Sequence, residues 1–331
     1  MPNLTRRSFL QSAAVGTALA APAFNRPALA RTTTVTVASL LGEDKPETKI
    51  WRHIAGRVEA SLPGRFRFNI VANGALGGEK EVAEGARLGS VQASLATVSA
   101  LSGWVPEVQI LDLPFLFRDA AHVRRVVDGP VGEDLQRRLA EENFVVGGFI
   151  DYGARHLLAK EPITRPAQLA GRRIRVIQSP LHTTLWRAYD AAPVGIPITE
   201  TYNALSTGVA DAMDLTKSAY AGFKLYEVVP FMTETGHIRA SGVVYYAASF
   251  WNRLGEEERA VLRDATAEGA DEFNRLVAED EHASVQAALA NGGQVLKAEG
   301  LEEWRAGAQA VWRDFASIVG GADKIGEVER A

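Results

Sequence analysis

Two arginines alternate with apolar residues in one short segment of the chain. If this segment is a strand, Ile174 and Val176 lie on one face and Arg173 and Arg175 on the other. Pro180 follows shortly, and its position predicts the first turn of a helix. Open α/β sheets bind ligands at the carboxyl ends of parallel strands. An arginine at such an end can hold a carboxylate bidentately or form a structural ion pair, and both alternatives apply to Arg175.

Other residue patterns give no support for catalysis. The glycine-rich stretch 74–80 lacks the Gly-Lys-Ser/Thr ending of a phosphate loop and the spacing of a dinucleotide site. The six histidines include no His-x-x-x-His pair, and the chain has no cysteine, so neither a catalytic metal site nor a thiolate nucleophile is expected. No Gly-x-Ser-x-Gly elbow occurs. We therefore predict a protein without cofactor or metal that is not an enzyme.

The first thirty residues are typical of an export signal. Arg6 and Arg7 precede an Ala/Val/Gly stretch over 13–21, and Ala28-Leu29-Ala30 fits a signal peptidase site. The apolar stretch has about half of the ~20 residues that a membrane-spanning helix needs. We expect export through the twin-arginine pathway, cleavage after Ala30 and a periplasmic mature chain. No other segment is apolar enough to span a membrane, so we expect no membrane insertion of that mature chain.

The charge balance argues against nucleic acid as a partner. Residues 1–30 carry three of the 36 basic residues and none of the 40 acidic ones, so the remainder has a formal charge of −7. A chain of this charge repels phosphate backbones. Binding of an anion must therefore depend on a local group of arginines.

Strand and helix patterns alternate along the chain, which predicts an α/β fold with parallel sheet. The pattern restarts near Arg173, and a helix of over thirty residues is expected from Glu256 to about Leu289. Such a helix is roughly 50 Å long, enough to brace two lobes. We expect ordered crossover strands near Ile150 and Ala240 to join the lobes. The other expected elements are strands at 34–39, 66–70, 93–97 and 145–150, and helices at 46–62, 79–88 and about 120–142.

An ordered series of short motifs resembles the DctP-type substrate-binding proteins of TRAP (tripartite ATP-independent periplasmic) transporters. Each motif is weak alone, whereas the series is specific and covers most of the mature chain. The motifs are Leu113-Pro114-Phe115, Gly153-Ala154-Arg155, residues 169–176, residues 199–211, Tyr226-Glu227-Val228 and residues 251–254 leading into the long helix.

This resemblance implies a two-lobed fold of the periplasmic-binding-protein type that closes on a solute. The expected lobes are residues 31–152 with 241–280, and residues 153–240 with 281–331. Arg175 matches the main carboxylate-binding arginine of the family, and Arg155 matches its usual second basic contact. The implied partners are a small organic anion and the small and large membrane subunits of a TRAP transporter.

The chain departs from the family pattern after residue 210. Many relatives have Asp-Gly-Gln-Glu-Asn-Pro where this chain has residues 211–216, so Leu215 replaces an asparagine and Asp214 a glutamate. Because leucine cannot form a hydrogen bond, we expect a ligand that is less hydroxylated or more apolar near its acid group. Asp214 could accept a hydroxyl or amine of the ligand, or could cap a turn.

Alignment with the family adds further cleft candidates, which are Thr97, Ser99, Ile198, Ser39, Trp186 and Tyr220. Aromatic residues on helices belong to the core more often than to a binding site, and this alternative applies to Trp186 and Tyr220. Two other functions stay open at this point. One is a solute-binding protein for another importer or a membrane sensor, and the other is an exported oxidoreductase that contains a cofactor.

Overall fold

A pair of long central strands joins two stretches of parallel sheet. The computed structural model describes residues 32–331, so the expected export signal lies outside the described residues. The nine strands of this part form one sheet in the order β2-β1-β3-β8-β4-β7-β5-β6, with β9 paired to β8. Strand β8 runs antiparallel to β3 and β4, and β4 runs antiparallel to β7. The strands are β1 Thr33–Ala38, β2 Phe66–Val71, β3 Ala93–Thr97, β4 Phe144–Ala159, β5 Arg173–Val176, β6 Ala192–Gly195, β7 Ala212–Thr216, β8 Phe231–Ala247 and β9 Gln294–Lys297.

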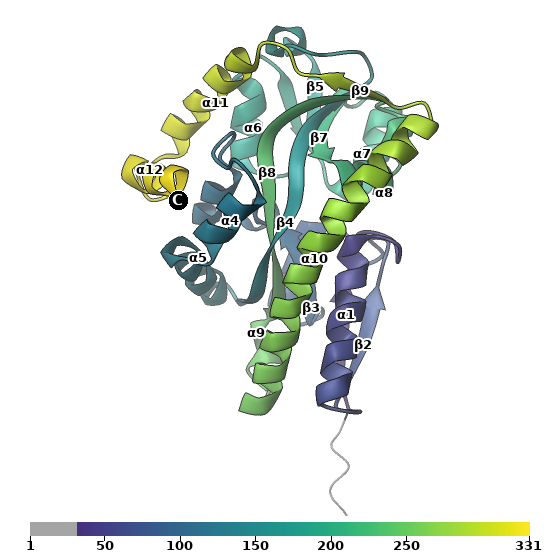
Figure 1. The fold of residues 1–331 in the computed structure, drawn as a ribbon, viewed down its shortest axis with the longest axis vertical. Helices are drawn as coiled ribbons and strands as arrows, with labels where there is room; N and C mark the ends of the chain where they lie inside the picture. Colours follow the sequence, from purple (N-terminus) through teal and green to yellow (C-terminus); the bar gives the residue numbers. More distant parts are fainter. Residues whose placement is uncertain (1–31) are drawn as a thin grey trace, which may run out of the picture. The chain divides into compact units, whose positions relative to one another are not determined.

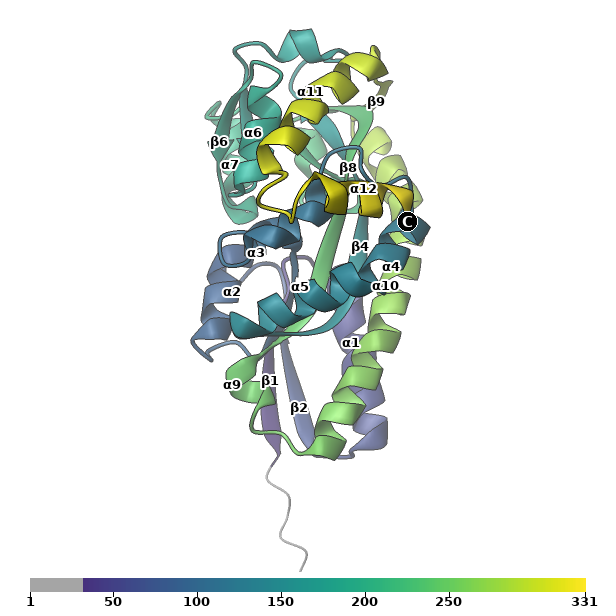
Figure 2. The ribbon, with the colours of Figure 1, turned by 90° about the vertical axis from the view of Figure 1, so that its left-hand side faces the viewer.

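Helices cover the sheet (Figures 1 and 2). The α-helices are α1 Pro46–Ser61, α2 Glu79–Arg87, α3 Val98–Leu101, α4 Ala120–Val127, α5 Pro130–Glu141, α6 Pro180–Arg187, α7 Ile198–Ser206, α8 Lys217–Gly222, α9 Ala248–Trp251, α10 Glu256–Ala290, α11 Leu301–Phe315 and α12 Ala322–Arg330. Three 3₁₀ helices occur among the described residues, η1 Pro106–Asp112, η2 Pro166–Leu169 and η3 Leu225–Glu227.

Strands β4 and β8 run through both halves of the molecule. Figure 2 shows β1 and β2 in the lower half, β6 in the upper half, and β4 and β8 between them. Helix α10 packs against α1, β4 and α8 and so contacts elements of both halves. At 1.5 Å per residue its 35 residues extend about 52 Å. The two-lobed α/β fold with crossover strands and a bracing helix is therefore confirmed. The boundaries of the two lobes stay a prediction, because residues 32–331 form one compact unit.

The expected single helix over 120–142 is wrong, because two helices occupy this stretch. Helix α4 ends at Val127, and α5 begins at Pro130, which lacks the N–H that a continuous helix would need. The chain also turns tightly here, since a Cβ on Gly132 would lie only 1.8 Å from the carbonyl oxygen of Val127. The apolar periodicity continues across this break and hides it in the sequence.

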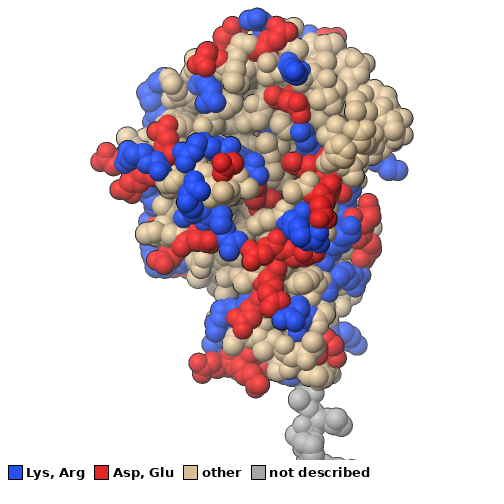
Figure 3. Space-filling model, viewed as in Figure 1, with Lys and Arg blue, Asp and Glu red and all other residues tan. Residues whose placement is uncertain are grey.

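Basic and acidic side chains are interspersed on the face that Figure 3 shows. This face therefore presents no extended basic field of the kind that nucleic-acid binding requires. Within residues 32–331, no helix combines the length and the apolar character needed to cross a membrane.

Candidate functional site

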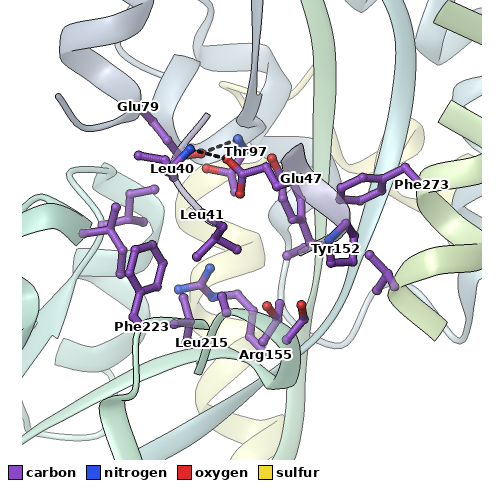
Figure 4. A pocket seen from close by; sticks show the side chains of 18 of the residues that line it. Leu40, Leu41, Glu47, Glu79, Thr97, Tyr152, Arg155, Leu215, Phe223 and Phe273 are labelled. Atoms are coloured by element: carbon purple, nitrogen blue, oxygen red, sulfur yellow. Dashed lines mark hydrogen bonds between the residues drawn. The ribbon is translucent and has the colours of Figure 1, made fainter. Parts of the chain in front are cut away.

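A pocket lies where the two halves of the molecule meet (Figure 4), and its empty space is ≈ 670 Å³ including the part open to solvent. Its side chains come from α1, α2, α7, α8, α10, β3, β4, β7, β8 and β5 or from the segments next to them. The residues that line it are Leu40, Leu41, Pro46, Glu47, Glu79, Thr97, Tyr152, Arg155, Arg175, Ile177, Ile198, Leu215, Thr216, Ser218, Ala219, Phe223, Ala240, Phe273 and Val277.

Arg175 is a buried cation that forms no ion pair within residues 32–331. It lies on β5 and is 2% exposed, whereas Arg173, two residues earlier, is exposed and pairs with Asp211 at 2.8 Å. The Nε of Arg175 donates to the carbonyl of Ile196 at 2.8 Å, and no described carboxylate lies within 4 Å of its guanidinium. Burial and the nearby charge of Arg155 lower the pKa of Arg175 to about 10. The guanidinium thus stays charged at neutral pH and can accept an anion from the pocket.

Arg155 is also buried, but it already has an acidic partner. It lies on β4, and its Nε donates to Asp214 Oδ2 at 2.5 Å while Nη2 donates to the Asp214 carbonyl at 2.8 Å. Burial alone would lower the pKa of Arg155, but the charge and hydrogen bond of Asp214 raise it. The ion pair fixes the guanidinium so that it reaches the pocket from the strand that crosses between the halves.

Asp214 is completely buried behind Arg155 and does not line the pocket. Nε2 of His237 lies 3.3 Å from its Oδ2, and Nδ1 of His237 contacts the Thr235 hydroxyl at 2.7 Å. Burial would raise the pKa of Asp214, but the charge of Arg155 and the hydrogen bond from His237 hold it well below its usual range. Of the two expected roles, ligand contact or turn cap, the geometry shows neither, because the carboxylate is engaged by Arg155 and His237.

Apolar side chains form most of the pocket between its charged groups. Leu215 on β7 is 8% exposed, and Leu41 and Phe223 lie near it in Figure 4. On another wall the rings of Tyr152 and Phe273 meet edge to face with centroids 5.2 Å apart. The pocket therefore offers apolar surface as well as charged groups.

Two glutamates that the sequence did not single out also line the pocket. Glu47 begins α1 and is 5% exposed, and Glu79 begins α2. Acidic residues in a first helical turn are common because they interact favourably with the helix dipole. The sequence pattern therefore gives no sign that these two also line a cavity. Tyr152 and Phe223 were likewise missed, because aromatic residues in a strand and after a helix look like core.

The structure brings five of the ten candidate site residues to the pocket and places five elsewhere. Those in the lining are Arg175, Arg155, Leu215, Thr97 and Ile198. Asp214, Ser99, Ser39, Trp186 and Tyr220 lie outside it.

Each of these residues outside the pocket has another contact. The hydroxyl of Ser39 bonds that of Thr48 at 2.7 Å, and the hydroxyl of Ser99 donates to Asp112. The ring of Trp186 packs edge to face on His237 in the core. Tyr220 is similarly buried, and its hydroxyl donates to the carbonyl of Val229 at 2.9 Å. Their side chains are thus occupied in holding the surrounding elements together.

No group of three or more His, Asp or Glu residues within 32–331 is arranged to hold a metal ion. What the described geometry offers is one unpaired buried guanidinium, a second guanidinium fixed by an aspartate, and an apolar cavity beside them.

Comparison with known proteins agrees with this geometry. Residues 37–318 match the sequence profile of bacterial extracellular solute-binding proteins, family 7, named DctP. The chain belongs to this family. The family comprises solute-binding proteins, and the predicted family membership is confirmed.

Three family relatives illustrate the likeness. The C4-dicarboxylate-binding periplasmic protein of Rhodobacter capsulatus is 28% identical over 335 aligned positions that cover 99% of each chain. A TRAP periplasmic solute-binding protein of Bradyrhizobium, solved with α/β-D-galacturonate, is 30% identical with a TM-score of 0.85, covering 90% of this chain and 98% of its own. A protein of the same kind from Shewanella oneidensis, solved with succinate, is 25% identical with a TM-score of 0.85 and the same coverage.

Proposed function

We propose that this DctP-family protein is the periplasmic solute-binding component of a TRAP transporter. It binds a small organic acid in the pocket between its lobes and delivers the acid to the membrane subunits, without chemical turnover. The observation that carries the proposal is the buried guanidinium of Arg175, which faces the pocket and has no carboxylate partner within the described residues. A ligand carboxylate supplies that partner when the lobes close.

The solved relatives support an organic acid, since galacturonate and succinate occupy two of them. In this chain Leu215 offers no hydrogen bond next to the arginines, and Ile198, Leu41 and Phe223 extend the apolar wall. The proposed ligand is therefore less hydroxylated near its acid group than a sugar acid.

A thermal-shift screen of the purified protein tests this function. The panel consists of small organic anions with uncharged analogues as controls. A ligand at about 100 times its dissociation constant adds about 2.7 kcal/mol to the native state, so a bound acid raises Tm. An unchanged Tm with every acid, together with a higher Tm with an uncharged or cationic compound, would overturn the proposal.

The Arg175→Ala variant tests the residue that carries the proposal. We expect it to stay folded, because no ion pair is lost, and to bind the acid more weakly by on the order of 2–5 kcal/mol. Arg173→Ala on the same strand is the matched control, since its side chain pairs with Asp211 at the surface. Isothermal titration calorimetry of both variants measures the difference. Equal affinity in the two variants would contradict the role of Arg175.

The membrane partner and the export route are proposals of the same kind. Adjacent genes for a small four-helix and a large twelve-helix membrane protein would support a TRAP transporter over another importer or a sensor. Export of a tagged protein in cells without the twin-arginine translocase would contradict the proposed pathway. Visible absorbance of a cofactor in the purified protein would contradict a purely binding role.

A further inference from the structure

The pocket has an acidic end as well as a basic one. Glu47 Oε1 accepts the N–H of Leu40 at 2.9 Å, and Glu79 Oε1 accepts the N–H of Thr97 at 2.6 Å. The second oxygen of Glu47 receives no hydrogen bond from the described residues, whereas the Thr97 side chain also interacts with the carboxyl of Glu79. Glu47 therefore has an acceptor available to a ligand, and Glu79 adds a second acidic group beside it.

Neither glutamate forms an ion pair with an arginine of the pocket, although the charge of Glu79 acts on both arginines. No nitrogen of Arg155 or Arg175 lies within 4 Å of a carboxyl oxygen of Glu47 or Glu79 within the described part of the chain. Figure 4 shows Glu47 and Glu79 on the side of the cavity opposite Arg155, with Leu41 between them in this view. The space between the two ends is lined by apolar side chains that include Leu215 and Phe223.

We infer that the ligand is a monocarboxylate with an apolar middle and a hydrogen-bond donor, hydroxyl or ammonium, at the end away from its acid group. This inference rests on the proposed function, because it assumes that a carboxylate lies against Arg175 and Arg155. Above about pH 8, where Glu47 is ionised, a second carboxylate at the far end would face this negative charge and lose its hydration without gaining a donor. The pocket is thus predicted to reject dicarboxylates, although a relative was solved with succinate.

Specificity of this kind is strong because the glutamate oxygens are partly desolvated. A site built to receive a donor discriminates sharply against an analogue that lacks it, since the buried acceptor is left without a partner. A ligand of the same size with an apolar group at this end leaves Glu47 and Glu79 without a hydrogen-bond donor from the ligand. The expected loss for a ligand without a donor is roughly 10- to 100-fold in affinity.

Binding of a hydroxyl ligand and binding of an ammonium ligand should differ in whether Glu47 releases a proton. Burial raises the pKa of Glu47 to about 8, although the Leu40 N–H opposes the shift. A hydroxyl can bind to the protonated group, whereas an ammonium ion favours its ionised form and releases a proton. The other titratable groups that line the pocket are Glu79, Tyr152, Arg155 and Arg175.

Matched ligands test the inference. The first series is succinate, 4-hydroxybutyrate, 4-aminobutyrate and butyrate, which differ only at the end remote from one carboxylate. The second is terephthalate, 4-hydroxybenzoate, 4-aminobenzoate and 4-methylbenzoate. We expect a hydroxyl- or amino-bearing acid to bind roughly 10- to 100-fold more tightly than its apolar analogue, and the diacid to bind most weakly. Calorimetry in buffers of different ionisation enthalpy then counts the protons released on binding. We expect proton release with 4-aminobutyrate and none with 4-hydroxybutyrate.

Glutamine variants locate the source of the discrimination. Glu47→Gln and Glu79→Gln each remove one acidic group. Each should reduce the ratio of the affinity for the donor-bearing acid to the affinity for the diacid by about tenfold or more. Glu84→Gln is the matched control, because Glu84 lies on α2 with Glu79, pairs with Arg87 and does not line the pocket. The control should leave the ranking of the ligands unchanged.

Two results would overturn the inference. One is a diacid that binds the wild-type protein as tightly as the donor-bearing acid, and the other is a ranking that neither glutamine variant alters. In either case, binding that still depends on Arg175 leaves the proposed function intact. Absence of binding by every acid in both series and in the wider organic-acid panel overturns the proposed function together with the inference.

Discussion

At the scale of single residues, the two arginines of the pocket differ in what their removal leaves behind. Arg155→Ala leaves the Asp214 carboxylate buried beside two histidines, His237 and His182, without its arginine partner. Removal of one partner from a buried ion pair costs about 3–5 kcal/mol, so we expect a loss of that size in the free energy of unfolding. Urea denaturation measures it. Adding Asp214→Asn to the variant should restore part of the stability, and no restoration would show that the pair itself is not responsible.

The protonation of Glu47 makes the free energy of unfolding depend on pH. Its pKa of about 8 in the folded protein exceeds its ordinary value of 4.5, because burial disfavours the charged form. Between these pH values the folded state binds more protons than the unfolded state. The free energy of unfolding therefore falls as pH rises, by up to about 1.4 kcal/mol per pH unit from this group. Urea denaturation at pH 5 and pH 8 should show a smaller fall for Glu47→Gln, and an equal fall would contradict the shift.

The site residues were predictable where their local pattern is unusual. Arg175 stands out because an arginine that faces inward at a strand end needs an anionic partner, which is either a ligand or an acidic side chain. Asp214 could not be placed, since its partner Arg155 lies 59 residues earlier and meets it only through the pairing of β4 with β7. Glu47 and Glu79 have an ordinary local role, so only the three-dimensional fold shows that they meet at a cavity.

At the scale of elements, the packed helices α1 and α10 each contain a glycine, and only the one on α10 is needed for close packing. A Cβ on Gly269 of α10 would lie 2.7 Å from Cγ1 of Ile54, whereas one on Gly56 of α1 meets nothing within 4 Å. We expect Gly269→Val to destabilise the protein by about 1–3 kcal/mol through overpacking. Gly56→Ala should stabilise it by about 0.5–1 kcal/mol through helix propensity. Thermal denaturation of both variants measures the signs, and equal signs would contradict this account of the interface.

Helix α10 was predicted within one residue of its observed ends, because its composition is uniform and a glycine precedes it. Strands β4 and β8 were predicted only in part. They contain polar residues such as Asp151, Arg155 and Arg239, which interrupt the apolar pattern. These interruptions occur where the strands pass the pocket and the ion pair of Asp151 with Arg239. The prediction was therefore weakest in the segment that serves the site.

At the scale of the whole molecule, Asp280 on α10 links the two predicted lobes. Its carboxylate accepts the ammonium of Lys45 at 3.1 Å and the hydroxyl of Ser218 at 2.5 Å. We expect Asp280→Asn to fold normally and to weaken acid binding by about 1 kcal/mol, because the closed form loses this bridge. Asp271→Asn is the control, since Asp271 lies on the same helix and pairs with Arg124 at the surface. Calorimetry and small-angle X-ray scattering measure affinity and compaction, and equal values in both variants would contradict the link.

The irregular pairing of β4 with β8 has a mechanical consequence. The register shifts between Asp151 and Ala154, and again between Arg155 and Leu157, so the ladder is interrupted on both sides of Arg155. A strand pair bends most easily where it has fewest ladder bonds, so we expect bending at these two points. In the function that we propose, a solute bound by Arg155 would lie between them. Such a solute would move very little while the far ends of the lobes move through longer paths, and its binding would change the shape of the surface that the protein offers to the membrane subunits.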